Sequence, residues 1–394
     1  MTSSLRRALP DSSRSFNSTR SFDSPFLPAL LAFCLAFSLC FLYARQHNFN
    51  ITAFVSAGHP TANEQLLPRG FFMQPHRGHD GQFYYRLALN PFTSTRTANG
   101  IWLDNPAYRQ QRVFYPFTVW VLSFGQKNLV PFVMVAVNVL ALSALGFLGG
   151  LWAKRFDVHA TWGVLLALHP GFLFSLWLDL TEILQAALLV GALWALQNRR
   201  QTATAILISL AVLTKETALL FAVAALGVWL WERRAAIEKQ TVASRVWICP
   251  FVVYVAWQLI VFSIWKQLPA TSGTNNLGAP FMGVFDLLTQ RASPLVFAQL
   301  LALILFTFVV AYRVRKAAVP RLAKMSWLLY GALSICLSFA VWSVDVNYVR
   351  ALGEYVMCGL LIVLASSSTR MRLVFALTMF ALICFRANTV LQLF

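Results

Sequence analysis

Acidic and basic residues lie at the ends of several apolar runs of this sequence. Asp179 and Glu182 lie between two such runs, and their spacing predicts that they share one face of a helix. Lys215 and Glu216 lie between two further runs. An ionisable group at membrane depth is costly, so it indicates a compensated charge pair or a site that binds a substrate or a metal. We expect Asp179 or Glu182 to pair with Lys215 or with an arginine of the first outer loop, residues 45–128.

The longest polar stretch contains a further candidate in the segment GHDGQFYYRLALNPF, which starts at Gly78. Asp80 lies between Gly78 and Gly81, and these glycines predict the backbone freedom of a tight turn. An aromatic and basic helical run should follow and end at the Asn90-Pro91 pair. The Asp80 carboxylate could therefore cap this helix or act chemically.

Two arginines follow in the segment LDNPAYRQQRVFYPF, which starts at Leu103. Arg109 and Arg112 are three residues apart and would share one face if this stretch is helical. They could bind an anionic group, pair with Asp104 or contact lipid headgroups.

Composition places these groups in a membrane protein. Of 394 residues, 58% are hydrophobic and 12% are charged, whereas soluble domains have roughly 25% charged residues. The mean hydropathy of +0.63 also excludes a disordered chain. The six cysteines lie in apolar runs and lack the spacing of a disulfide scaffold or a metal site.

The predicted fold is an all-α polytopic membrane protein, because about 20 apolar residues suffice to cross the bilayer as a helix. Eleven runs are candidates, near residues 25–44, 129–152, 160–178, 182–197, 202–214, 217–231, 246–265, 295–312, 326–342, 350–366 and 372–391. We expect a disordered cytoplasmic tail over residues 1–24 and one membrane domain over residues 25–394. Residues 45–128 would form a long first extracytoplasmic loop, and the first run would be an uncleaved anchor.

The net charge of +18 comes from 32 Lys and Arg against 14 Asp and Glu. With the N-terminus inside, every predicted inner segment is short and basic, so most of this charge sets orientation instead of binding nucleic acid. Nine acids fall outside or at the outer edge, namely Glu64, Asp80, Asp104, Asp179, Glu182, Glu216, Asp286, Asp345 and Glu354. We therefore expect the chemistry on the outer face.

These motifs resemble the GT-C superfamily of membrane glycosyltransferases, which use lipid-phosphate-linked sugars. The resemblance is closest to a bacterial group associated with cell-surface glycopolymer formation, in which we expect G-[YH]-D-G-Q-F-[YF]-Y-R-[LI]-A and then Y-R-x-Q-R-x-x-Y-P. This chain has GHDGQFYYRLA at 78–88 and YRQQRVFYP at 108–116. LDLTE at 178–182 and LTKETALL at 213–220 are also similar, with Lys215 in place of an expected arginine. The resemblance covers residues 70–225.

The resemblance implies transfer of a sugar from a polyprenyl-phosphate donor to a glycan, lipid or protein acceptor, with inversion. It implies that Asp80 is the catalytic base, and a leaving lipid phosphate would need cationic partners. The residues then expected to bind substrate are Tyr84, Tyr85, Arg86, Arg109, Arg112, Tyr115, Asp179, Glu182, Lys215, Glu216 and Arg350. Arg350 could instead be an interfacial residue that snorkels to the headgroups.

No metal site is predicted, and any cofactor stays undetermined, because the spacing of His76 and His79 before Asp80 is a weak metal pattern. The expected partners are a lipid-linked sugar donor, its acceptor and membrane lipids, without nucleic acid. The expected location is the cell membrane, specifically a bacterial inner membrane. Two other functions stay open: a transporter or flippase of lipid-linked saccharides, which predicts internal repeats and charges midway along spans, and a non-enzymatic scaffold for glycopolymer assembly.

Overall fold

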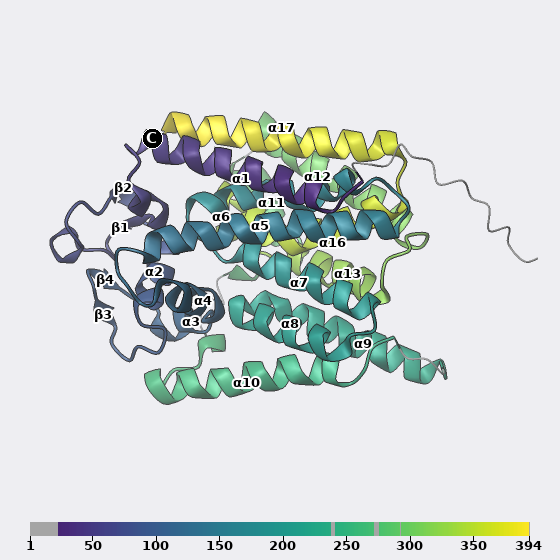
Figure 1. Ribbon diagram of the computed structural model, residues 1–394, viewed down its shortest axis with the longest axis horizontal. Coiled ribbons are helices and arrows are strands. Elements are labelled where there is room, and N and C mark those ends of the chain that lie inside the picture. Colours follow the sequence, from purple (N-terminus) through teal and green to yellow (C-terminus); the bar gives the residue numbers. More distant parts are fainter. Residues whose placement is uncertain (1–22, 238–240, 272–275, 292, 394) are drawn as a thin grey trace, which may run out of the picture.

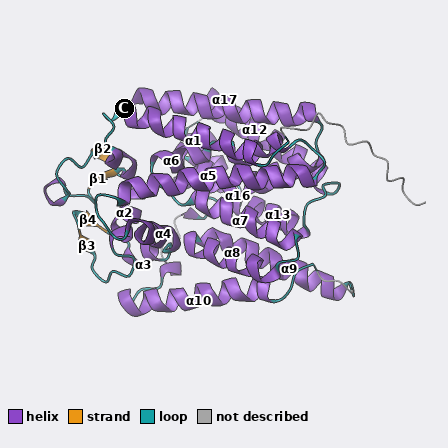
Figure 2. Ribbon diagram, in the orientation of Figure 1, coloured by secondary structure: helices purple, strands orange, loops and turns teal. Residues whose placement is uncertain are grey.

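The computed structural model describes residues 23–237, 241–271, 276–291 and 293–393, and this part of the chain is mostly helical (Figure 2). Long helices run side by side in a bundle, and a lobe of short helices and strands covers one end of it (Figure 1). Residues 47–129 are called the lobe below. The opposite end of the bundle, where α1 begins, is called the far end.

Five of the described helices are long and apolar enough to cross a membrane, so the protein is membrane-embedded. They are α1 (Phe26–Gln46), α5 (Val130–Arg155), α10 (Arg245–Trp265), α12 (Pro294–Val314) and α17 (Thr369–Leu393). A sixth span results if η3 (Ala160–Ala167) and α6 (Gly171–Trp177), bent by 67° at their junction, are taken together. Eleven spans were predicted, whereas five or six helices of the described residues are long and apolar enough to cross a membrane.

The remaining bundle helices have 14 to 16 residues, namely α7 (Glu182–Gln197), α8 (Gln201–Thr214), α9 (Leu219–Arg234), α13 (Arg321–Ile335) and α16 (Gly353–Ser366). They pack among the longer helices, α7 against α5 and α8, and α16 against α12 and α13. Polar turns cut them short. After α8, for example, Lys215 adopts an extended backbone (φ −159°, ψ 133°) before η4 (Glu216–Ala218).

Small residues bring α1 and α5 close together. Ala32 and Ala36 of α1 are fully buried, whereas Phe33 is exposed. A Cβ atom on Gly146 of α5 would lie 2.4 Å from the Pro28 carbonyl oxygen, so a glycine is needed there. Small side chains allow such close packing where lipid supplies no hydrophobic driving force.

The lobe connects α1 to α5 and has secondary structure of its own. Its elements are η1 (Ile51–Val55), β1 (Ala57–His59), η2 (Glu64–Leu66), β2 (Met73–Arg77), α2 (Gly81–Leu89), β3 (Thr97–Ala98), β4 (Ile101–Trp102), α3 (Pro106–Gln110) and α4 (Phe114–Ser123). β1 pairs with β2 in parallel, and β3 pairs with β4 antiparallel. The helical run after Asp80 is confirmed as α2, which ends before Asn90.

Short elements connect the later helices at the lobe end of the bundle. They are η5 (Pro269–Thr271), α11 (Met282–Gln290), α14 (Phe339–Trp342) and α15 (Asp345–Ala351). α15 packs against α6, which brings Arg350 beside the turn that precedes α7.

Candidate active site

The first turn of α2 places Asp80 against the turn that precedes α7. A Cβ atom on Gly81 would lie 2.2 Å from the Leu178 carbonyl oxygen, so this contact requires a glycine. Gly81 therefore lets α2 approach the Leu178 backbone closely. The predicted need for glycine's backbone freedom in a tight turn is not found at Gly81. Asp80 occupies the N-cap position of α2 but makes no capping hydrogen bond. The Asp80 carboxylate therefore does not cap α2, which was one of its two expected roles.

Arg109 is the nearest partner of Asp80. Its Nη1 donates to Oδ1 of Asp80 at 2.8 Å, while its Nε and Nη2 donate to the two carboxylate oxygens of Asp104, each at 2.8 Å. The guanidinium also lies over the Phe83 ring, 4.0 Å from the ring centre. The planar group thus holds two carboxylates in a fixed geometry, which a lysine could not do.

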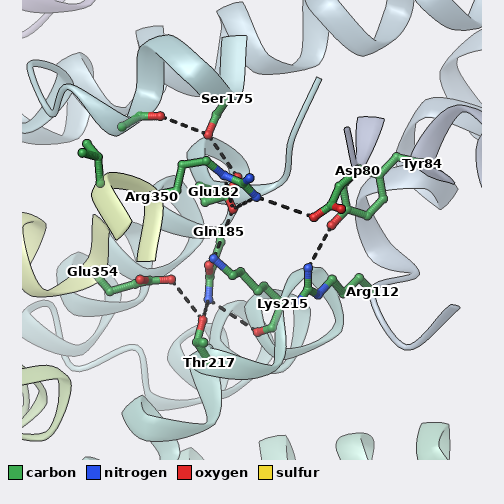
Figure 3. Close-up of polar contacts among 12 residues, drawn as sticks. Asp80, Tyr84, Arg112, Ser175, Glu182, Gln185, Lys215, Thr217, Arg350 and Glu354 are labelled. Carbon is green, nitrogen blue, oxygen red and sulfur yellow. Dashed lines mark hydrogen bonds and ion pairs between the residues drawn. The ribbon is translucent and has the colours of Figure 1, made fainter. Parts of the chain in front are cut away.

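Glu182 connects this group to the bundle (Figure 3). Its Oε1 accepts from Nζ of Lys215 at 3.1 Å and from Nε and Nη2 of Arg350 at 3.1 and 2.7 Å. Its Oε2 accepts from the Ser175 hydroxyl at 3.0 Å. Nη2 of Arg350 also lies 3.8 Å from Oδ2 of Asp80. Of the alternatives expected from the sequence, the structure forms the pair of Glu182 with Lys215. Arg350, which lies outside the first outer loop, also pairs with Glu182 and bridges it to Asp80.

Arg112 binds a second carboxylate from the bundle. Its Nε and Nη2 donate to Glu216 at 2.8 and 2.5 Å, and its other donors reach the hydroxyls of Tyr84 (3.2 Å) and Tyr108 (2.6 Å). Tyr84 lies one turn after Asp80 on α2, so Arg112 ties this helix to η4. Because α3 ends at Gln110, the predicted shared helical face of Arg109 and Arg112 does not form.

These contacts define one polar cluster. Its members are Asp80, Tyr84, Asp104, Tyr108, Arg109, Arg112, Glu182, Lys215, Glu216 and Arg350. Four cations face four carboxylates, so the formal charge of the cluster is zero. The Asp80 side chain is 28% exposed, whereas Glu182 is 4% exposed. The cluster therefore opens to its surroundings on the Asp80 side and is closed on the Glu182 side.

The charges of the cluster keep its lobe carboxylates ionised. Burial by itself raises the pKa of Asp80, but the guanidinium groups of Arg109 and Arg350 outweigh it and lower the pKa to about 2. Burial also acts against ionisation of Asp104, and hydrogen bonds from Arg109 hold the pKa of that carboxyl below its usual range. Both groups are therefore negative at neutral pH.

The polar cluster is where residues distant in the sequence meet. Comparisons with models of known families, with curated proteins and with solved structures found no match. The chemistry of the cluster, together with the motifs of the lobe, carries the functional argument that follows.

A second layer of polar residues supports the cluster from within the bundle. The Thr217 hydroxyl donates to Oε1 of Glu354 at 3.1 Å and accepts from Nε2 of Gln185 at 3.0 Å (Figure 3). The sequence marks Glu354 only as an outer acid, and it does not single out Thr217 or Gln185. In the sequence, Gln185 and Glu354 are polar residues within apolar runs, and Thr217 follows the Lys215-Glu216 pair. Such positions indicate either a structural hydrogen bond or a site, and only the fold distinguishes the two.

Two residues predicted to bind substrate in α2 lie outside the cluster. Arg86 is buried and donates through Nη2 to the hydroxyls of Thr93 and Thr95, each at 3.0 Å. Tyr85 is buried in the hydrophobic core of the lobe. Both follow Asp80 at spacings that turn them away from its face of the helix. Arg86 therefore holds lobe segments together through Thr93 and Thr95 and makes no contact with Asp80.

Two further predicted residues, Tyr115 and Asp179, make no hydrogen bond or ion pair with the cluster, although the Tyr115 ring meets the Tyr84 ring edge-on at 5.7 Å. The Tyr115 hydroxyl accepts from Nδ2 of Asn138 at 3.1 Å. Asp179 is fully buried, and neither carboxylate oxygen has a hydrogen-bond partner among the described residues. It has a left-handed backbone (φ +47°) and α7 begins only at Glu182, so the predicted common helical face is wrong.

Asp179→Asn is expected to leave the stability at pH 7 unchanged or to raise it by about 1 kcal/mol or more, because burial without a partner penalises the charged carboxylate. Burial raises the pKa of Asp179 well above its usual range, and the nearby Asn138 amide offsets only part of this. The penalty appears as pH rises above the pKa of the unfolded chain, so the difference between variant and wild type should shrink below about pH 4. Unfolding in detergent at pH 4 and pH 7 measures it. A clear destabilisation at pH 7 would contradict this view of Asp179.

The histidines before Asp80 do not form a metal centre with it. Within the described ranges, no three His, Cys, Asp or Glu side chains are grouped so that they could hold a metal ion. His76 is exposed on β2. His79 lies beside Asp80, and burial together with the charge of Arg350 lowers its pKa, so it adds little charge at neutral pH.

Proposed function

We propose that this protein is an integral membrane glycosyltransferase that moves a sugar from a polyprenyl-phosphate donor to an acceptor on the extracytoplasmic face. The observation that carries the proposal is the ionised, partly exposed Asp80 carboxylate between two arginines, Arg109 at 2.8 Å and Arg350 at 3.8 Å. This arrangement offers a base for the acceptor and cations for a phosphate in one place. The resemblance of the lobe motifs to the GT-C superfamily points to the same chemistry.

The reaction balances on these groups. The acceptor oxygen or nitrogen attacks the anomeric carbon and passes its proton to Asp80, while the bond from that carbon to the phosphate oxygen breaks. The electron pair stays on the phosphate, whose charge changes from −1 to −2 as Asp80 becomes neutral. The total charge in the site is therefore unchanged. A single displacement of this kind inverts the anomeric centre.

The arginines would have a second role before the chemical step. In the absence of donor, Arg109 and Arg350 hold the pKa of Asp80 at about 2, so its carboxylate is a weak base. A donor phosphate would compete for the same guanidinium donors, because arginine binds phosphate and carboxylate with the same fork. Part of the stabilisation of the Asp80 anion would then be lost, and its basicity would rise when the donor is in place.

The position of the polar cluster favours transfer over transport. The cluster joins lobe residues to the bundle at the beginnings of α2, α7 and η4 and in α15. A transporter would place its charged groups near the middle of its spans, between repeated halves.

A labelled-donor assay tests the proposal. Purified protein in detergent or liposomes is given a panel of polyprenyl-phosphate sugars and candidate acceptors, and both labelled product and released polyprenyl phosphate are measured. We expect at least one donor to be consumed with equal amounts of the two products. A folded protein that moves intact lipid-linked sugar between leaflets without cleaving it would instead support the transporter alternative.

The pH dependence of transfer tests the pairing of Asp80 with Arg109. Because the pKa of Asp80 is about 2, kcat/KM of the wild type should show no acid limb down to about pH 4. In Arg109→Gln the carboxylate loses its nearest cation, so its pKa should rise by about 1–3 units and an acid limb should enter the measurable range. Arg69→Gln, an exposed arginine of the same lobe, is the matched control. Identical profiles for wild type and Arg109→Gln would contradict the pairing.

A further inference from the structure

A cavity of about 690 Å³ lies at the far end of the bundle, away from the polar cluster. It is formed by the last turns of α5 and α7, the start of α1 and the segment after α12. The lining residues that matter here are Leu151, Lys154, Arg155, Phe156, Trp194 and Gln197. Two cations, one amide and two aromatic rings thus surround one space.

The two cations of the cavity have no carboxylate partner among the described residues. Nζ of Lys154 donates to the main-chain oxygen of Asp23 at 2.9 Å, while the Asp23 carboxylate accepts from the backbone N–H of Ala160 at 2.7 Å. With its amide turned to accept, Gln197 takes hydrogen bonds from Nε and Nη2 of Arg155 at 3.1 and 2.6 Å. The guanidinium is therefore held along one edge and keeps Nη1 for a ligand.

The rest of the lining is apolar and is held in place by aromatic contacts. The Trp194 ring meets Trp152 edge-on at 5.3 Å, and Trp152 stacks on Phe156 at 5.4 Å. Leu151 adds an aliphatic surface. A small hydrated anion would use the cations but not these side chains, whereas a phospholipid would use both.

The surroundings of the cavity are basic. Described cations at this end of the bundle are Lys154, Arg155, Arg199, Arg200, Arg233, Arg234, Arg245, Arg313, Arg315, Lys316, Arg321, Lys324, Arg370 and Arg372, and the described acids are Asp23, Asp157 and Glu232. In sequence, residues 1–22 add four arginines and one aspartate. Their charge has the same sign as that of the cavity, which argues against the preceding segment as its occupant and favours an anionic lipid.

We propose that this cavity binds one anionic phospholipid of the surrounding leaflet. Its phosphate lies between Nζ of Lys154 and Nη1 of Arg155, and its glycerol and upper acyl carbons lie over Trp194 and Phe156. This site is independent of the proposed transferase activity, because it lies at the other end of the bundle from Asp80.

Native mass spectrometry of the purified protein in detergent tests the site with phosphatidylglycerol and phosphatidylcholine as probes. We expect the wild type to retain one phosphatidylglycerol in preference to phosphatidylcholine. The double variant Lys154→Gln/Arg155→Gln should lose this retention on the order of tenfold, since it removes both charge-assisted contacts. Arg199→Gln/Arg200→Gln changes two exposed cations at the same end that do not line the cavity, and it should retain the lipid.

Equal loss in both double variants, or equal retention of the two lipids by the wild type, would overturn the proposal. The charge-preserving variant Lys154→Arg/Arg155→Lys should keep most of the binding, which separates loss of charge from loss of folding. Inorganic phosphate, added at the concentration at which phosphatidylglycerol raises the unfolding temperature, should have no effect. Equal stabilisation by free phosphate would show that the cavity is an anion site and that the apolar lining has no role.

Discussion

Asp80→Asn is expected to lower the rate of sugar transfer by about 10²–10⁴-fold, the usual contribution of a positioned general base. The amide oxygen can still accept from Nη1 of Arg109, which lies 2.8 Å from the carboxylate in the wild type. Arg109 also keeps both hydrogen bonds to Asp104. The variant therefore loses the base and retains the frame around it. Transfer is measured with the labelled donor that the wild type uses best.

Asp179→Asn is the matched control for this experiment. It changes the same functional group at a neighbouring turn, where the carboxylate contacts no member of the polar cluster. We expect it to keep most of the transfer activity. Size-exclusion chromatography and circular dichroism verify that both variants are folded. Full activity in Asp80→Asn, or equal loss in both variants, would remove the basis for assigning the base.

Glu182→Gln is expected to destabilise the protein by about 3–5 kcal/mol, because it leaves buried cations without their counter-charge. Glu182 accepts three hydrogen bonds from Lys215 and Arg350 and is 4% exposed. The same change should lower transfer, since Arg350 would be free to move toward Asp80. Chemical unfolding in detergent measures the stability, and the labelled-donor assay measures the rate.

A second substitution tests whether unpaired charge is the cause. Lys215→Met in the Glu182→Gln background removes the cation that has lost its carboxylate, while Arg350 keeps its contact with Asp80. The double variant should recover part of the lost stability, because a buried ion pair can be replaced by apolar side chains at little cost. If the two changes destabilise additively, the Glu182–Lys215 pair is not coupled as the geometry indicates.

The sequence was a good guide to the charged residues of the cluster. Ionisable groups beside apolar runs are costly, so most of them pair with an opposite charge, although the buried Asp179 does not. The pair formed by Glu182 and Lys215, which a full helical hairpin separates, is one of the alternatives that the sequence predicts. Asp104 was likewise expected as one alternative partner of the lobe arginines, and it binds Arg109.

The sequence was a poorer guide wherever the direction of a side chain decided the outcome. A spacing of three residues predicts a common face only inside a helix. Asp179 precedes α7 with a left-handed backbone, and Arg112 follows the end of α3, so both predicted pairs face different ways. Arg86 has the residue type of a phosphate ligand, but its place on α2 directs it to Thr93 and Thr95.

Hydropathy placed the short runs 182–197, 202–214 and 217–231 close to α7, α8 and α9, but it gave residues 160–178 as one run, which the structure divides into η3 and α6. Hydropathy marks which residues avoid water but not where a polar turn interrupts the helix. The α8–η4 turn at Lys215 and the 67° bend between η3 and α6 divide apolar sequence into shorter pieces. Interruptions of this kind are tolerated in a membrane where other groups satisfy the freed backbone. Here the Lys215 main-chain oxygen accepts from Nε2 of Gln185 at 3.4 Å.

The most direct test of the proposed function is a single-turnover measurement with a radiolabelled polyprenyl-phosphate sugar and excess purified protein. We expect the wild type to produce labelled acceptor and free polyprenyl phosphate in equal amounts, and Asp80→Asn to produce neither at a comparable rate although it binds the donor. Donor cleavage at the same rate in both proteins, or donor binding without any cleavage by the wild type, would contradict the claim that Asp80 is the base of a glycosyltransferase.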